Sequence, residues 1–77
     1  MHKVKIYTTP TCVFCDLAKE FLNENNVAFD SVDVSVDEKA AQEMIDKTGQ
    51  FGVPVIDVDG KMIIGFNKPE LKKALGL

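Results

Sequence analysis

Arginine and tryptophan do not occur in this sequence, and cysteine, proline and glycine are sparse, with two, three and five copies. All nine basic residues are lysine, and twelve acidic residues bring the net charge to -3. Nucleic-acid binding needs a basic surface and often uses arginine for bidentate contacts with bases, so this composition argues against it. With 45% hydrophobic and 27% charged residues, the chain is neither disordered nor collagen-like, and we expect a single domain over residues 1–77.

Long apolar segments are missing as well. The longest uninterrupted run is the four residues from Cys12 to Cys15, far short of the ~20 that span a bilayer. The chain does not open with a charged stretch and an apolar block, so we expect no signal peptide. These features predict a cytoplasmic monomer without membrane contacts.

Periodicity predicts a β-α-β-α-β-β-α order and therefore an α/β fold with helices packed on a small mixed sheet. The first β-α-β unit should be a right-handed parallel crossover, and Asp59-Gly60 should turn an antiparallel hairpin. We expect strands over 3–8, 27–34, 53–58 and 61–64, and helices over about 12–25, from behind Ser35 to Gly49, and from behind Asn67 to Gly76.

Helix caps and core residues follow from the same pattern. Thr11 is the expected N-cap of the first helix, and Ser35 with Glu38 resembles a capping box for the second. Apolar residues recur at helical spacing in the first helix, at Phe14, Leu17, Ala18, Phe21 and Leu22. The second helix is expected to bury Ala40, Ala41, Met44 and Ile45.

Cys12 and Cys15 are a poor structural staple because a disulfide between them closes a loop of only four residues. Chain entropy gives such a loop roughly 2 kcal/mol of stabilisation. Half of a zinc site with His2, and two buried cysteines without a role, are alternatives to a redox function.

The position of the pair favours redox chemistry. Residues three apart lie on one face of a helix, close enough for a disulfide bond. Cys12 falls at the expected N-terminus of the first helix, where free N–H groups and the helix dipole stabilise a thiolate, which is the nucleophile in disulfide exchange. Cys15, one turn further and nearer the core, should stay protonated longer and act as the resolving thiol.

Val53-Pro54 is the second unusual feature, because proline removes a hydrogen-bond donor from an apolar strand. A cis bond at the start of the strand explains it, and a plain edge strand beginning at Pro54 is the alternative. Gly52 before the pair permits a close approach of another group to the backbone.

With these features in this order, the chain resembles a glutaredoxin over nearly all of its length. The residues that carry the resemblance are Ile6-Tyr7-Thr8, Cys12 with Cys15, Ala18-Lys19, Thr48-Gly49-Gln50, Val53-Pro54 and Gly65-Phe66. The resemblance implies a thioredoxin fold, with a four-stranded mixed sheet flanked by three helices. It implies a thiol-disulfide oxidoreductase in which Cys12 attacks, Cys15 resolves and a cis Pro54 lies beside them.

The resemblance also implies how substrates bind. An extended substrate pairs with the backbone of Val53, Gln50 contacts glutathione, and the helix N-terminus at Asn67 takes a glutathione carboxylate. The remaining implied substrate-binding residues are Thr11, Val13, Phe14, Gly65 and Phe66. No tightly bound cofactor or metal is expected.

The electron source follows from the departures within this resemblance. Glutathione-using members usually have Pro-Tyr where this chain has Val13-Phe14, lysine in place of Thr9, and threonine in place of Gly52. Gly65-Phe66, followed by Pro69-Glu70, is more similar to the glutaredoxin-like hydrogen donors of ribonucleotide reductase, which thioredoxin reductase reduces. We therefore expect thioredoxin reductase as electron source ahead of glutathione. A carrier that binds a [2Fe–2S] cluster across a dimer with glutathione is the alternative function.

Overall fold

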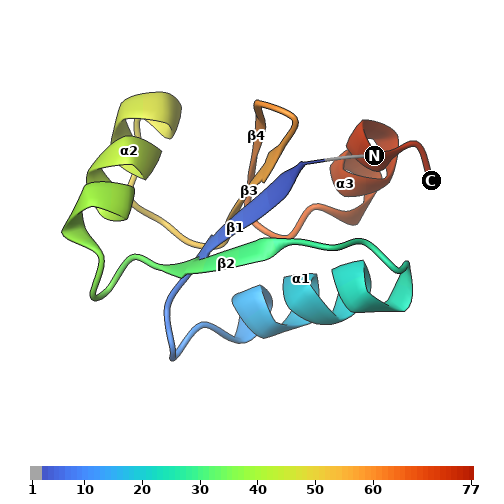
Figure 1. The fold of residues 1–77 in the computed structure, drawn as a ribbon, viewed down its shortest axis with the longest axis horizontal. Helices are drawn as coiled ribbons and strands as arrows, with labels where there is room; N and C mark the ends of the chain where they lie inside the picture. Colours follow the sequence, from blue (N-terminus) through green and yellow to red (C-terminus); the bar gives the residue numbers. More distant parts are fainter. Residues whose placement is uncertain (1–2) are drawn as a thin grey trace.

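The structure is a computed structural model that describes residues 3–77, and it has the predicted element order (Figure 1). Its sheet has the strand order β2-β1-β3-β4, in which β1 and β2 are parallel and the other two pairs are antiparallel. The predicted α/β fold is therefore confirmed. The elements are β1 (Val4–Thr8), α1 (Val13–Glu24), β2 (Asp30–Asp33), α2 (Glu38–Thr48), β3 (Val55–Val58), β4 (Lys61–Ile64) and α3 (Lys68–Leu75).

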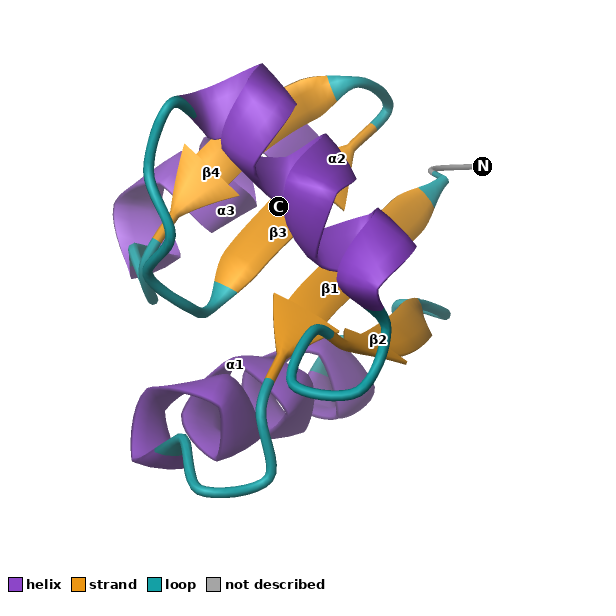
Figure 2. Cartoon of the chain, turned by 90° about the vertical axis from the view of Figure 1, so that its left-hand side faces the viewer, coloured by secondary structure: helices purple, strands orange, loops and turns teal. Residues whose placement is uncertain are grey.

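Hydrophobic side chains form one core cluster on each face of the sheet. In β1, Val4 and Ile6 belong to the cluster that contains residues of α1 and α3, whereas Tyr7 belongs to the cluster with α2. Figure 2 shows α1 and α2 on opposite sides of the strands. β1 is a central strand and is buried on both faces. The chain leaves its C-terminal end at Thr8 and continues directly into the segment that carries the cysteines.

Some predicted boundaries were wrong. The third strand begins at Val55 rather than at residue 53. The second strand covers only Asp30–Asp33, because the backbone N–H of Val27 still donates to the carbonyl of Leu22 at 2.9 Å as the chain leaves α1. The capping box at Ser35 does not form. Asp37 is the N-cap of α2 and accepts the N–H of Ala40, whereas Ser35 donates to the Asp33 carboxylate.

The apolar stripe of α1 is wider than the face that the sheet covers. Phe14 is 62% exposed and Leu17 is 40% exposed, so helical spacing alone does not place a residue of α1 in the core. The buried positions of α1 are Cys15, Ala18, Phe21 and Leu22. On α2, Ile45 is only partly buried, unlike its predicted core neighbours. Within residues 3–77, no helix is both long enough and apolar enough to cross a membrane.

Tyr7 forms the main polar contact between the sheet and α2. Its hydroxyl donates to Oε1 of Glu43 at 2.9 Å, and the amino groups of Lys5 and Lys47 lie 3.6 and 3.2 Å from the same oxygen. Burial raises the pKa of Tyr7 to about 12, and the hydrogen bond to Glu43 acts in the same direction. That hydrogen bond and the one from Lys47 hold the pKa of the Glu43 carboxyl below its usual value.

Titration of Tyr7 is expected to show this contact directly, since the chain has one tyrosine and no tryptophan. Phenolate absorbance of the folded protein should rise with a midpoint near pH 12, and in denaturant near the ordinary value of about 10. Because the folded pKa is the higher one, the stability that Tyr7 contributes is fully present below about pH 10 and is lost as pH rises towards 12. Glu43→Gln should lower the folded midpoint. A midpoint near 10 in the folded wild type contradicts the prediction.

Candidate active site

Cys12 is the N-cap of α1, a position that the sequence had assigned to Thr11. Its backbone is extended, with φ -91° and ψ 108°, and its Sγ accepts the backbone N–H of Cys15 at 3.1 Å. Thr11 lies in an exposed turn before it. The sulfur therefore takes over the role that a serine or threonine oxygen has in other helices. The Cys12 sulfur thus faces a backbone N–H at the N-terminal end of α1.

Cys15 has the opposite environment, since its side chain is fully buried. Burial raises the pKa of the Cys15 thiol, and its interaction with Cys12 acts in the same direction. Contacts with Thr8 and Thr9 oppose this effect without reversing it. Thr8 carries part of the family resemblance but was given no role at the site; its other signal is a polar side chain at the end of a buried strand. The pair thus consists of a partly exposed cysteine at the helix terminus and, three residues further on, a buried cysteine whose pKa is raised by burial.

Pro54 lies at the same end of the sheet as the segment that leads to Cys12. Tyr7 pairs with Val55, so the next residues outward, Thr8 and Pro54, are neighbours at this edge. The Val53–Pro54 bond is cis, as predicted, and β3 begins only at Val55, so the alternative of a plain strand from Pro54 was wrong. The carbonyl of Pro54 accepts the N–H of Gly65 at 2.8 Å, which brings a third predicted segment to this end.

Exposed apolar side chains occur in the segments around this end of the sheet. Val13 and Phe14, directly after Cys12, are 69% and 62% exposed. Phe51, shortly before the cis bond, is 64% exposed, and Ile64, next to Gly65, is 53% exposed. Exposed apolar side chains mark a protein-binding site where they form one contiguous patch, whereas single ones are common on any surface.

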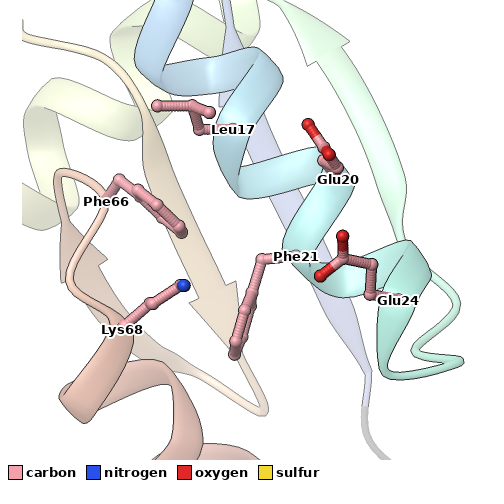
Figure 3. Close-up of a pocket in the computed structure, with 6 residues that line it drawn as sticks. All are labelled: Leu17, Glu20, Phe21, Glu24, Phe66 and Lys68. Carbon is pink, nitrogen blue, oxygen red and sulfur yellow. The ribbon is translucent and has the colours of Figure 1, made fainter.

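Phe66 is placed differently from the other predicted substrate-binding residues. Its ring meets the ring of Phe21 edge-on, with centroids 6.1 Å apart, and packs against the core. Figure 3 shows both rings beside a groove of about 130 Å³ between α1 and the start of α3, with the amino group of Lys68 above Phe21. The cysteines do not line this groove. The structure therefore gives Phe66 a packing role, and its contact with substrate stays a prediction.

Two predicted glutathione contacts are already engaged within the chain. The side-chain amide of Gln50 accepts the N–H of Gly52 at 2.7 Å and donates to its carbonyl at 3.0 Å. Asn67 is the N-cap of α3, as predicted, and accepts the N–H of Glu70 at 3.3 Å. Because Pro69 has no N–H, the first turn of α3 has few donors left for a carboxylate.

No group of three or more histidine, cysteine, aspartate or glutamate residues within 3–77 is arranged to hold a metal ion. His2, the other ligand considered for a zinc site with the cysteines, lies outside the described residues.

Comparisons with known proteins agree with this geometry. The glutaredoxin family model matches residues 4–63. An uncharacterized glutaredoxin-like 8.6 kDa protein in the rubredoxin operon of Clostridium pasteurianum is 47% identical over 72 residues, covering 94% of this chain and 96% of its own. Glutaredoxin 3 of Escherichia coli (strain K12) is 35% identical over 65 residues, covering 84% of this chain and 78% of its own.

Among solved structures, a mutant of the thioredoxin-like protein BC3987 superimposes with a TM-score of 0.91 at 33% identity, covering 99% of this chain and 97% of that one. This likeness identifies the fold as thioredoxin-like. The family match covers the cysteine pair, the cis bond and most of the sheet. The chain therefore belongs to the glutaredoxin family, as a glutaredoxin-like thiol-disulfide oxidoreductase with a C-x-x-C pair at Cys12 and Cys15.

Proposed function

We propose that this protein reduces disulfides of other proteins through a dithiol mechanism in which Cys12 attacks and Cys15 resolves. The observation that carries the proposal is the asymmetry of the pair. The Cys12 sulfur accepts a helix N–H at 3.1 Å and is partly exposed, whereas Cys15 is buried and its pKa is raised by burial. In this mechanism the thiolate of Cys12 is accessible to a substrate disulfide, and the buried Cys15 attacks only after the mixed disulfide has formed.

The reaction has two exchange steps. The Cys12 thiolate attacks one sulfur of the substrate disulfide, forms a mixed disulfide with it, and releases the other sulfur as a thiolate that takes a proton. Cys15 then loses its proton and attacks the Cys12 sulfur, which releases the second substrate thiol and leaves a Cys12–Cys15 disulfide. The substrate has gained two electrons and two protons, and an external donor must return two electrons to the pair.

Val53 and Pro54 are proposed to hold the substrate. Proline has no N–H, so Pro54 brings no backbone donor that competes at the reacting sulfur. Val53, one residue earlier, is inferred to pair through its backbone with an extended segment of substrate. The exposed side chains of Val13, Phe14 and Phe51 support a protein surface as the substrate, because a small polar disulfide gains little from apolar contacts.

Thioredoxin reductase is proposed as the electron donor ahead of glutathione. Glutathione carries two carboxylates, and this chain has no arginine to form bidentate pairs with them. The Gln50 amide is bonded to Gly52, and Asn67 and Pro69 leave few free N–H groups at α3. A dithiol donor must also be kept reduced, so we propose the cytoplasm as the place where it works.

An NADPH-coupled assay is expected to separate the two donors. Loss of a charge-assisted pair costs glutathione binding ~1–2 kcal/mol, which corresponds to about a tenfold weaker affinity. We expect poor turnover with glutathione and glutathione reductase, and better turnover when a thioredoxin reductase reduces the protein. Efficient turnover with glutathione, and none with thioredoxin reductases, contradicts the proposed donor and leaves the dithiol chemistry intact.

A further inference from the structure

The segment between α2 and the cis bond is held by an unusual side-chain contact. The amide of Gln50 bonds both backbone polar groups of a single residue, Gly52, with N–H to Oε1 at 2.7 Å and Nε2–H to the carbonyl at 3.0 Å. The segment is also tied back to α2, since the hydroxyl of Thr48 lies 3.1 Å from the Gln50 carbonyl and 2.7 Å from the Met44 carbonyl. We call the Gln50–Gly52 pair the amide clamp.

Gly52 is required for the amide clamp because the amide occupies the space of a side chain. A Cβ built on Gly52 lies 2.8 Å from Oε1 of Gln50, closer than carbon and oxygen approach in proteins. Oε1 is the end of a flexible side chain, so a larger residue at position 52 displaces the amide and leaves the loop backbone in place.

The clamp acts on the residue next to the proposed substrate contact. The carbonyl of Gly52 and the N–H of Val53 belong to one planar trans peptide unit and point in opposite directions. Holding that carbonyl against the Gln50 amide therefore directs the Val53 N–H away from Gln50. The clamp also satisfies both polar groups of Gly52, which limits an incoming strand to pairing at Val53.

We propose that Gln50 is a positioning residue that fixes the Val53 backbone for a protein substrate and that, while clamped, is withheld from glutathione. This inference rests on the proposed function, and it adds a specificity role to the same site. Gln50 is not proposed to touch the reacting sulfurs. It acts through Gly52 and Val53, and it favours an extended protein segment over a tripeptide that needs the free amide.

Three variants test the inference: Gln50→Ala, Gly52→Ala and the two together. Each single change should raise KM for a protein disulfide roughly fivefold, as expected for losing hydrogen bonds that hold the binding backbone, with kcat nearly unchanged. The double variant should be no worse than either one, because both changes break the same clamp. Alkylation of Cys12 by iodoacetamide should keep its wild-type rate in all three.

With a glutathione mixed disulfide as substrate, the two single variants should differ. Gly52→Ala frees the Gln50 amide and should lower KM for a glutathione mixed disulfide several-fold, whereas Gln50→Ala removes the amide and should not lower it. The matched control is Gln42→Ala, since Gln42 makes an exposed hydrogen bond to Asp46 on α2 at 2.9 Å and should change no kinetic constant. A merely structural role for Gln50 would lower the unfolding temperature and would not produce this difference in KM between Gly52→Ala and Gln50→Ala.

Unchanged KM for both substrates in both single variants overturns the inference, as does additive loss in the double variant. The amide resonance of Val53 in a nuclear magnetic resonance spectrum gives a readout independent of activity. It should shift in Gln50→Ala and stay in place in Gln42→Ala. A wild type without disulfide reductase activity counts against the proposed function, and the Val53 resonance then decides whether the clamp positions that backbone.

Discussion

Cys12→Ser is expected to abolish disulfide exchange with every substrate, leaving only the uncatalysed rate. The proposed mechanism begins with a thiolate at the N-terminus of α1, and a serine hydroxyl at the same place is not ionised near neutral pH. Neither a protein disulfide nor a mixed disulfide of a small thiol should turn over. The measurement is the initial rate with each substrate, with electrons supplied by a chemical dithiol so that the choice of reductase does not matter.

The fold of this variant should survive, which makes the loss of activity informative. Cys12 accepts the N–H of Cys15 as the N-cap of α1, and serine is one of the preferred N-cap residues. The unfolding midpoint should therefore stay close to that of the wild type. Appreciable turnover by well-folded Cys12→Ser would remove Cys12 from the role of attacking thiol.

Cys15→Ser is expected to divide the activity in two. Reduction of protein disulfides should fall at least about a hundredfold, because an external thiol must replace a resolving thiol that is held beside Cys12 at high effective concentration. Exchange with mixed disulfides of a small thiol should survive, since that reaction needs only the Cys12 thiolate. Parallel rates for the two substrates on the same preparation measure the division.

The control for Cys15→Ser is its stability, since the substitution changes a buried side chain. Cys15 is fully buried beside Ala18 on the inner face of α1, so serine places a hydroxyl where a sulfur had packed, and a modest loss of stability is expected. If Cys15→Ser instead lost both reactions while remaining folded, Cys15 would have to be the attacking thiol.

Local rules were sufficient for several features of this molecule. Asp59 and Gly60 both have positive φ, 52° and 93°, as the hairpin turn between β3 and β4 requires. For this turn the physical cause lies within two residues, so the sequence alone displays it. The proline after Val53 left two choices, a cis bond and a plain edge strand, and the structure has the cis bond in front of a strand that lies between β1 and β4.

Features that depend on distant packing were harder to predict. The exposure of Phe14 and Leu17 depends on how much of α1 the sheet covers, which helical spacing does not reveal. Sequence rules favour a hydroxyl residue such as Thr11 as the N-cap. In the structure the helix begins one residue later, and the Cys12 sulfur accepts the N–H of Cys15 instead.

The contact of Gln50 with Gly52 was missed for a different reason. Family resemblance assigns the glutamine to glutathione, whereas the missing side chain at Gly52 leaves room for the amide on the chain's own backbone. The close approach to the Gly52 backbone that the sequence predicted does occur, and the group that approaches is the Gln50 amide rather than a substrate.

The most direct test of the mechanism is to trap the covalent intermediate. Cys15→Ser is mixed with an oxidised protein substrate, quenched with acid and an alkylating agent, and analysed by mass spectrometry without reduction. The mechanism predicts a stable adduct with substrate linked through Cys12, and none with Cys12→Ser under the same conditions. An adduct with Cys12→Ser linked through Cys15, and none with Cys15→Ser, would contradict the assignment of the two thiols.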